Sequence, residues 1–194
     1  AQQYGFIMGK MSVQVAEKEY TLQQAAKFLM QSDRALREEV YHKVNDRRLQ
    51  DKETLHKLFD DLLSKRHQIA LNAGFENYRD DKFEELGRFD YTVKDCEDFH
   101  ASIKKYITPI VEQLYAHKQK QLNLEELKPY DIDAEPAGQK PLAPFKNGEE
   151  LLEKSIQAFS NLRPYFGDCL RKMKSLNQFD LDSRKGKAPG GYNC

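Results

Sequence analysis

Apolar residues recur every three or four positions along most of this 194-residue chain, which is the spacing of the buried face of an α-helix. The pattern is clearest after Glu53, where an apolar stripe runs between charged faces as far as Gly74. Glycine readily takes the left-handed conformation of a helix C-cap, so Gly74 is expected to end this helix. A later stripe contains Pro109, which is expected to kink or break its helix. The sequence therefore predicts a mostly α fold built from antiparallel helical layers.

Residues near the start of the chain predict a small β-hairpin followed by capped helices. Residues 12–15 alternate polar and apolar side chains, and residues 20–22 resume the pattern after a short charged link. Thr21 then has Gln24 three residues later, the spacing of a capping box. Ser32 is expected to cap the next helix, with Asp33 placed to complement its positive dipole end.

Two stretches lack helical periodicity and divide the chain. Residues 127–145 contain four prolines and predict a long connection, which in a compact protein is more often functional or tightly packed than idle. Residues 179–191 combine glycines, a proline and basic side chains, so they cannot stay helical. We therefore divide the chain into a helical region with the hairpin at its start (1–126), a Pro-rich connection (127–147), a helical pair (148–178) and a Gly-rich segment (179–194).

Charge and cysteine content restrict the class of protein. The chain carries 31 basic and 31 acidic residues, and this balance does not favour binding to nucleic acid or an anionic membrane. Its three cysteines are widely spaced and odd in number, which fits a reducing compartment better than a disulfide framework. The apolar patch from Tyr4 to Met8 is too short to span a membrane. We expect a soluble, cytoplasmic protein.

The residues themselves indicate no catalytic or metal centre. None of the five histidines belongs to a His-Glu-x-x-His motif, and His56 and His67 lie three helical turns apart. Cys96 and His100 are close enough to touch on one helix, but Cys96 also fits the apolar stripe, where a buried cysteine acts as a small hydrophobe. We assign no catalytic residue and no metal ligand.

The Gly-rich segment resembles a phosphate-binding loop only superficially. A P-loop around Gly186 and Lys187 would need a glycine at position 181 and a serine or threonine at 188, and these positions hold Leu181 and Ala188. The segment retains backbone donors and basic side chains suited to lying along a peptide or a carboxylate. A flexible C-terminal tail is the alternative that composition leaves open.

The run from Asp180 to Tyr192 (DLDSRKGKAPGGY) resembles the segment before the catalytic helix of M3 metallopeptidases, in their oligoendopeptidase F branch. Further similar stretches follow the family in the same order. They are residues 19–22, 32–34 with Arg37 and Tyr41, 66–70, 74–78 and 127–131. The resemblance covers nearly the whole chain.

The resemblance implies a helical zinc peptidase whose two halves enclose a channel for short peptides. In this family a His-Glu-x-x-His helix and a later glutamate hold the zinc, which polarises the scissile carbonyl and activates water. This sequence contains no such helix, so no ligand can be assigned here, and zinc is expected only in the intact enzyme. The resemblance places Arg184, Lys187, Gly190, Gly191 and Tyr192 along one edge of the peptide channel.

Two functions remain open. The first is an internal fragment of an oligopeptidase that ends just before the catalytic helix, is inactive alone, and can self-associate through the face that the missing half would cover. A start without methionine and an end two residues after Tyr192 favour this expectation. The second is a self-standing helical scaffold or interaction module without catalysis.

Overall fold

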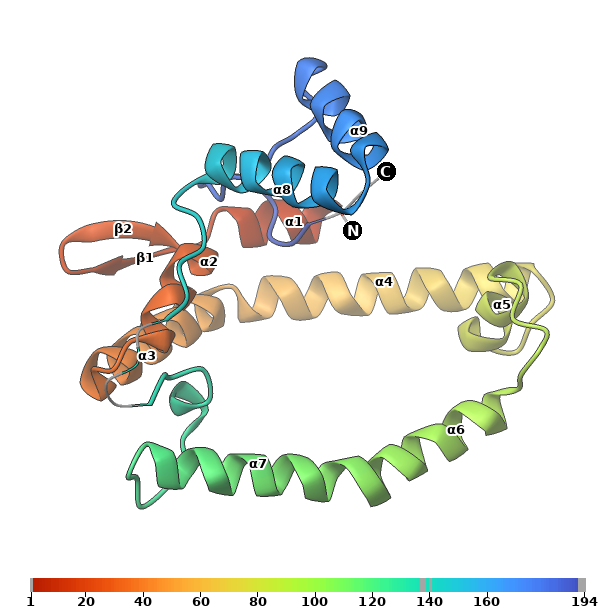
Figure 1. Cartoon of the computed structure of the whole chain (residues 1–194). Helices are drawn as coiled ribbons and strands as arrows, with labels where there is room; N and C mark the ends of the chain where they lie inside the picture. Colours follow the sequence, from red (N-terminus) through yellow and green to blue (C-terminus); the bar gives the residue numbers. More distant parts are fainter. Residues whose placement is uncertain (1, 137–138, 140, 192–194) are drawn as a thin grey trace.

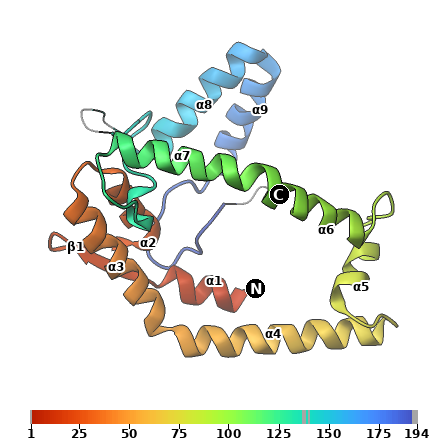
Figure 2. The same ribbon diagram turned by 90° about the horizontal axis from the view of Figure 1, so that it is seen from below.

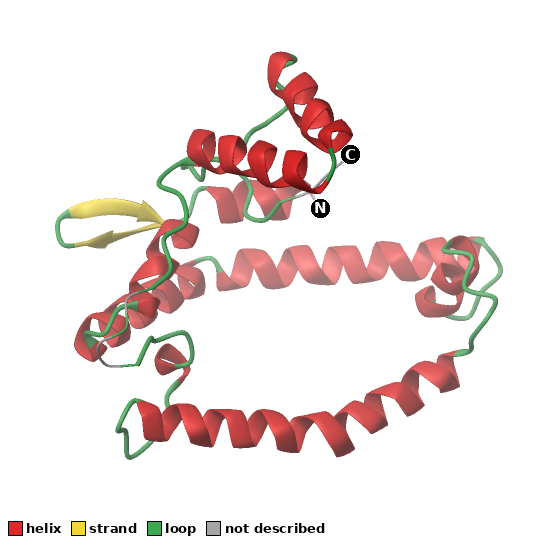
Figure 3. Ribbon diagram, viewed as in Figure 1, coloured by secondary structure: helices red, strands yellow, loops and turns green. Residues whose placement is uncertain are grey.

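Helices form most of the chain in the computed structural model, which describes residues 2–136, 139 and 141–191 (Figures 1 and 3). Within these residues, the β-structure is a small antiparallel hairpin of two strands. The mostly α fold with an N-terminal hairpin is therefore confirmed. The elements in order are α1 (Gln2–Gly9), β1 (Ser12–Val15), β2 (Lys18–Thr21), α2 (Leu22–Ala25), the 3-10 helix η1 (Ala26–Met30), α3 (Arg34–Gln50), α4 (Lys52–Asn72), α5 (Tyr78–Glu85), α6 (Val93–Ser102), the π-helical turn η2 (Ile103–Ile107), α7 (Thr108–Gln121), the 3-10 turn η3 (Pro129–Asp131), α8 (Gly148–Leu162) and α9 (Pro164–Ser175).

The hydrophobic core lies where the hairpin, α2 and α3 meet. Ser12 pairs with Thr21 and Val15 with Lys18 across the hairpin. The two-residue turn between the strands has positive φ at both Ala16 and its neighbour, a geometry that fits the twist of paired strands. The buried core side chains come from these three elements and from Met11 just before the hairpin: Met11, Val13, Val15, Leu22, Ala25 and Val40.

The helix starts follow their capping residues, with one correction. The Thr21 hydroxyl accepts from the Gln24 amide, and the Gln24 side chain accepts from the Thr21 amide, as the capping box predicts. The predicted Ser32 cap is wrong, because the helix begins one residue later. Asp33 is the N-cap and its carboxylate accepts from two helix amides. The Ser32 carbonyl instead accepts from the Arg37 guanidinium, so Ser32 stays outside the helix.

Two long helical arms are joined through α5 and are separated from each other over most of their length (Figures 1 and 2). One arm is α4, which Gly74 follows with a φ of +86°. The other is the continuous α6–η2–α7 helix. Pro109 does not break this helix. It is the second residue of α7 and directly follows the π turn η2, and prolines and π turns are both places where helices bend.

Both arms expose part of their apolar stripes, although stripes of this kind usually face a core. In α4, Phe59 is 61% exposed and Leu63 is 58% exposed. In α7, Leu114 is 62% exposed and every residue from 112 to 117 is exposed. Helices gain most of their stability from packing an apolar face, so both arms present surface suited to a further layer of protein.

The Pro-rich connection is pinned to α3 by a buried ion-pair cluster of Asp131, Arg34 and Arg37. Asp131 is fully buried, and its carboxylate lies 2.7 Å from Arg37 Nη2 and 3.0 Å from Arg34 Nη2. The neighbouring Tyr130 hydroxyl donates to Glu38 at 3.0 Å. The connection is therefore tightly packed at this point, and it brings together the two stretches 32–41 and 127–131 that resemble the M3 family.

Candidate functional site

Residues 179–191 are rich in glycine and are called the C-terminal loop. After α9 they return to the start of α8 and to α1 and α2, which lie near the start of the chain. The Gly186 amide donates to the Gly9 carbonyl at the end of α1, at 2.7 Å. The Gln24 side chain in α2 donates to the Ser183 carbonyl at 2.9 Å. The Gly148 amide at the start of α8 donates to the Asp182 carboxylate at 3.0 Å. The loop is therefore docked on the fold at three separate places.

Glycines make this close docking possible. A Cβ atom on Gly9 would lie 2.7 Å from the Lys187 carbonyl oxygen, closer than atoms normally approach, so only glycine lets the loop lie against α1. Gly186 and Gly190 have φ values of +88° and +95°, which other residues rarely adopt. The sequence pattern of this loop thus corresponds to real backbone requirements.

Two basic side chains of the loop, Arg184 and Lys187, are paired within it. Arg184 forms two hydrogen bonds to the Asp180 carboxylate, at 2.6 and 2.9 Å. The Lys187 ammonium donates to the carbonyls of Asp180 and Asp182, at 2.6 and 2.9 Å, and lies 3.1 Å from the Asp180 carboxylate. Hydrogen bonds from Arg184 and then Lys187 hold the pKa of Asp180 far below its ordinary value. Asp180 therefore stays ionised and keeps both cations oriented.

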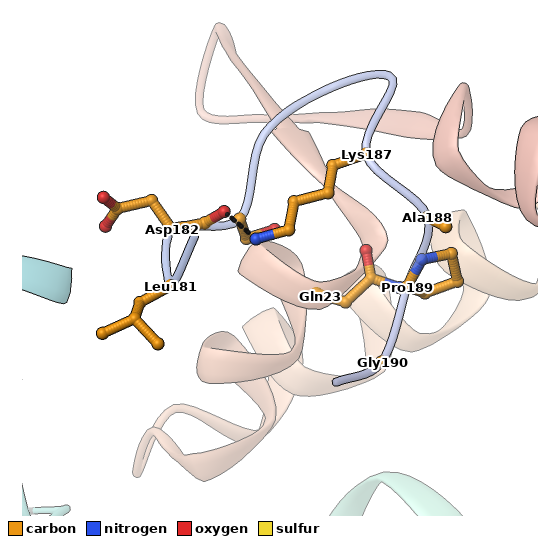
Figure 4. Close-up of a pocket in the computed structure, with 8 residues that line it drawn as sticks. Gln23, Leu181, Asp182, Lys187, Ala188, Pro189 and Gly190 are labelled. Carbon is orange, nitrogen blue, oxygen red and sulfur yellow. Dashed lines mark hydrogen bonds between the residues drawn. The ribbon is translucent and has the colours of Figure 1, made fainter. Parts of the chain in front are cut away.

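A small pocket of about 90 Å³ lies inside the loop, next to the start of α2 (Figure 4). The Lys187 side chain crosses it toward Asp182, and Pro189 and Gly190 form the wall that faces Gln23. Among the residues that the structure describes, the amides of Ala188, Gly190 and Gly191 make no hydrogen bond. The end of the loop can therefore offer backbone donors to a bound chain.

The structure brings together four of the five residues proposed to line a peptide channel. Arg184, Lys187, Gly190 and Gly191 all belong to the docked loop. Tyr192 lies outside the described residues. Whether these residues contact a peptide stays a prediction.

Sequence reasoning missed the partners that hold the loop, Asp180, Asp182 and Gly9. The spacing of Asp180 and Arg184, four residues apart with opposite charges, was a usable indication of their pairing. The role of Gly9 carried no local indication, because its neighbour in space lies almost the whole chain away.

The remaining titratable residues form no centre in the described part of the chain. Within residues 2–136, 139 and 141–191, no group of three or more histidine, cysteine, aspartate or glutamate side chains is placed to hold a metal ion. Cys96 and His100 line the same surface hollow, and the half-buried Cys96 thiol is free. No hydrogen bond joins these two side chains in the described structure. Over the same residues, no helix combines the length and apolar character needed to cross a membrane.

The sequence profile of peptidase family M3 matches residues 28–194. This chain belongs to peptidase family M3. No curated protein matches it closely enough to serve as a relative.

Solved structures show the same fold. PZ peptidase A, in a structure with inhibitor 2, is 26% identical with a TM-score of 0.91, over 98% of this chain and 34% of the other. A protein provisionally assigned as oligoendopeptidase F is 25% identical with a TM-score of 0.90, over 97% of this chain and 33% of the other. A second such protein, from Bacillus anthracis str. Ames, is 24% identical with a TM-score of 0.90, over 98% and 35%. The chain thus spans about a third of the length of the structures that it matches.

Proposed function

We propose that this chain is part of a zinc-dependent oligopeptidase of the oligoendopeptidase F type, which hydrolyses peptide bonds in short peptides. The observation that carries this proposal is the match to peptidase family M3 over residues 28–194. The likeness to provisional oligoendopeptidase F structures over nearly the whole chain supports the choice of branch. The three cysteines, of which Cys96 and Cys169 are free in the structure, favour a reducing compartment, and we place the enzyme in the cytoplasm.

The C-terminal loop is the part of this chain that we assign to the substrate. Arg184, Lys187, Gly190, Gly191 and Tyr192 would form one edge of the peptide channel. The amides near Gly190 that lack partners in the described structure support this role, because an extended peptide binds through main-chain hydrogen bonds.

The described residues do not fit a zinc ion, since they supply no set of ligands for one. No residue of this chain is therefore assigned a chemical step. In the intact enzyme, zinc would be held by residues outside this sequence, and the chain alone is expected to be inactive.

The test compares this chain with the complete peptidase chain that contains it, using a quenched fluorescent oligopeptide. We expect the complete chain to hydrolyse the peptide and to lose this activity on treatment with a chelator. The chain of 194 residues should give no turnover and hold no stoichiometric zinc in metal analysis. Chelator-sensitive turnover by the short chain would contradict its proposed inactivity.

A scaffold or interaction module without catalysis is the second candidate, and the exposed apolar arms favour it. This candidate predicts no peptidase activity from any chain that contains the sequence. Hydrolysis by the complete chain would exclude it.

A further inference from the structure

The charged group of Lys187 makes its polar contacts inside the C-terminal loop, and two of them are to backbone carbonyls. Its side chain is only 24% exposed. An ammonium group has three donors, and Lys187 gives two of them to the carbonyls of Asp180 and Asp182. Its charge also lies 3.1 Å from the Asp180 carboxylate, so the ammonium group is engaged by the loop itself.

These contacts close residues 180–187 into a ring, and the groups that dock the loop lie within this ring. Ser183 pairs with the Thr21 hydroxyl at 3.0 Å. Asp182 caps the start of α8 through the Gly148 amide. The Gly186 amide reaches Gly9. Lys187 joins the two ends of the ring that carries all three contacts.

Lys185 shows that basic charge alone does not give this role. It lies in the same loop, is 58% exposed and pairs at the surface with Glu19 at 2.6 Å. Exposed ion pairs of this kind contribute little to stability. Lys185 therefore provides a matched control for Lys187.

We propose that Lys187 is a positioning residue: it holds the carbonyls of Asp180 and Asp182 together and thereby fixes the loop that presents the Ala188 and Gly190 amides to a peptide. The peptide part of this inference rests on the proposed function. Lys187 then acts on substrate binding through the loop backbone and not as a direct ligand of a substrate carboxylate.

The first experiment measures amide hydrogen exchange in this chain and needs no activity. In Lys187→Met, exchange of the hydrogen-bonded Gly186 and Lys187 amides should be faster by about tenfold or more, since several charge-assisted hydrogen bonds that hold the loop are lost. In Lys185→Met it should stay within about twofold of the wild type, as expected for a surface pair. Exchange in α3 should be unchanged in both variants. Unchanged exchange in the loop, or an equal rise in α3, would overturn the positioning role.

The second experiment uses the complete peptidase chain with two forms of one peptide, a free C-terminal carboxylate and an amide. Lys187→Met should lower kcat/KM for both forms by the same factor, about tenfold, because the loop backbone is displaced in either case. Lys185→Met should leave both values near those of the wild type. A loss confined to the carboxylate form would make Lys187 a direct ligand and overturn the inference, as would no loss at all.

The two experiments distinguish failure of the proposed function from failure of the Lys187 inference. A wild-type complete chain that hydrolyses neither peptide would refute the proposed function, and with it the peptide part of this inference. The exchange experiment would still decide whether Lys187 orders the loop.

Discussion

Asp131 is the residue on which the position of the Pro-rich connection depends. Its carboxylate is fully buried and receives hydrogen bonds from Arg34, Arg37 and the Lys128 amide. A buried charge is tolerated only when it is paired and hydrogen-bonded, and here each carboxylate oxygen has a partner. The buried ion-pair cluster therefore joins α3 to a connection more than ninety positions later.

Removing one partner of this cluster should be costly. Arg37→Met leaves Asp131 buried with fewer donors, so we expect the free energy of unfolding to fall by about 3 kcal/mol, as for other broken buried pairs. The control Arg184→Met removes an exposed pair and should cost less than about 1 kcal/mol. Urea unfolding measures both. Similar losses in the two variants would show that burial does not matter at Asp131.

The same cluster predicts a dependence of stability on pH. Burial by itself would raise the pKa of Asp131, but hydrogen bonds from Arg34 and Arg37 lower it below its ordinary value. A carboxylate with a lower pKa in the folded state stabilises the fold above its unfolded pKa of about 3.9, and this stability is lost as pH falls further toward the folded pKa. The melting temperature should therefore decrease once the pH is lowered below about 4.

Asp131→Asn isolates this contribution, because the amide does not titrate. The variant should be less stable than the wild type near neutral pH and should lose less stability on acidification. Glu112→Gln, at an exposed position of α7, should follow the wild-type curve. If the melting temperatures of Asp131→Asn and the wild type fell in parallel from pH 6 to about pH 2, Asp131 would not be the source of this pH dependence.

At the scale of elements, α1 and the C-terminal loop depend on each other. Gly9 ends α1 and is buried under the Lys187 carbonyl, while the Gly186 amide donates to the Gly9 carbonyl. The first helix and the last described segment therefore share one interface. The position of the loop is set by elements from both ends of the chain.

Gly9→Ala tests this interface. The added Cβ would meet the Lys187 carbonyl at 2.7 Å, so we expect a loss of about 1–3 kcal/mol as the loop is displaced. Gly191→Ala is the matched control, because a Cβ there meets nothing within 4 Å. Thermal unfolding compares the two, and equal stabilities would show that the loop does not pack on α1 in solution.

At the scale of the whole molecule, the two arms carry apolar surface that the chain itself does not cover. Phe59 and Leu63 in α4, and Ile110 and Leu114 in α7, are each at least half exposed. Surfaces of this kind are commonly covered by another protein layer. In the chain studied alone, a second copy is the available partner.

We therefore predict self-association of the isolated chain. Sedimentation should show mass rising with concentration, and Ile110→Glu with Leu114→Glu should weaken association by at least about tenfold, because charge opposes burial of that face. The control Lys120→Glu changes an exposed charge at the end of the same helix. A strictly monomeric profile of the wild type at high concentration would count against this prediction.

Local structure was predictable from the sequence, because the apolar spacing and the caps of a helix involve residues only a few positions apart. The mostly α fold, the Thr21 cap and the end of α4 at Gly74 were predictable on this basis, and the Asp33 cap was missed by one residue. The hairpin was only weakly indicated, since its turn lacks the usual glycine or asparagine. The division into 1–126, 127–147, 148–178 and 179–194 stays a prediction.

Contacts between distant parts of the chain depend on the packing of the whole fold. Local patterns carry no record of contacts such as Thr21 with Ser183, which lie 162 positions apart, or Arg37 with Asp131. Periodicity marks an apolar face but not its partner, so it could not show that the arms are exposed. The same limit applied to the C-terminal loop: its glycines and lysines were visible in the sequence, but their docking on Gly9 depended on the packed fold, because close approach is a property of two surfaces together.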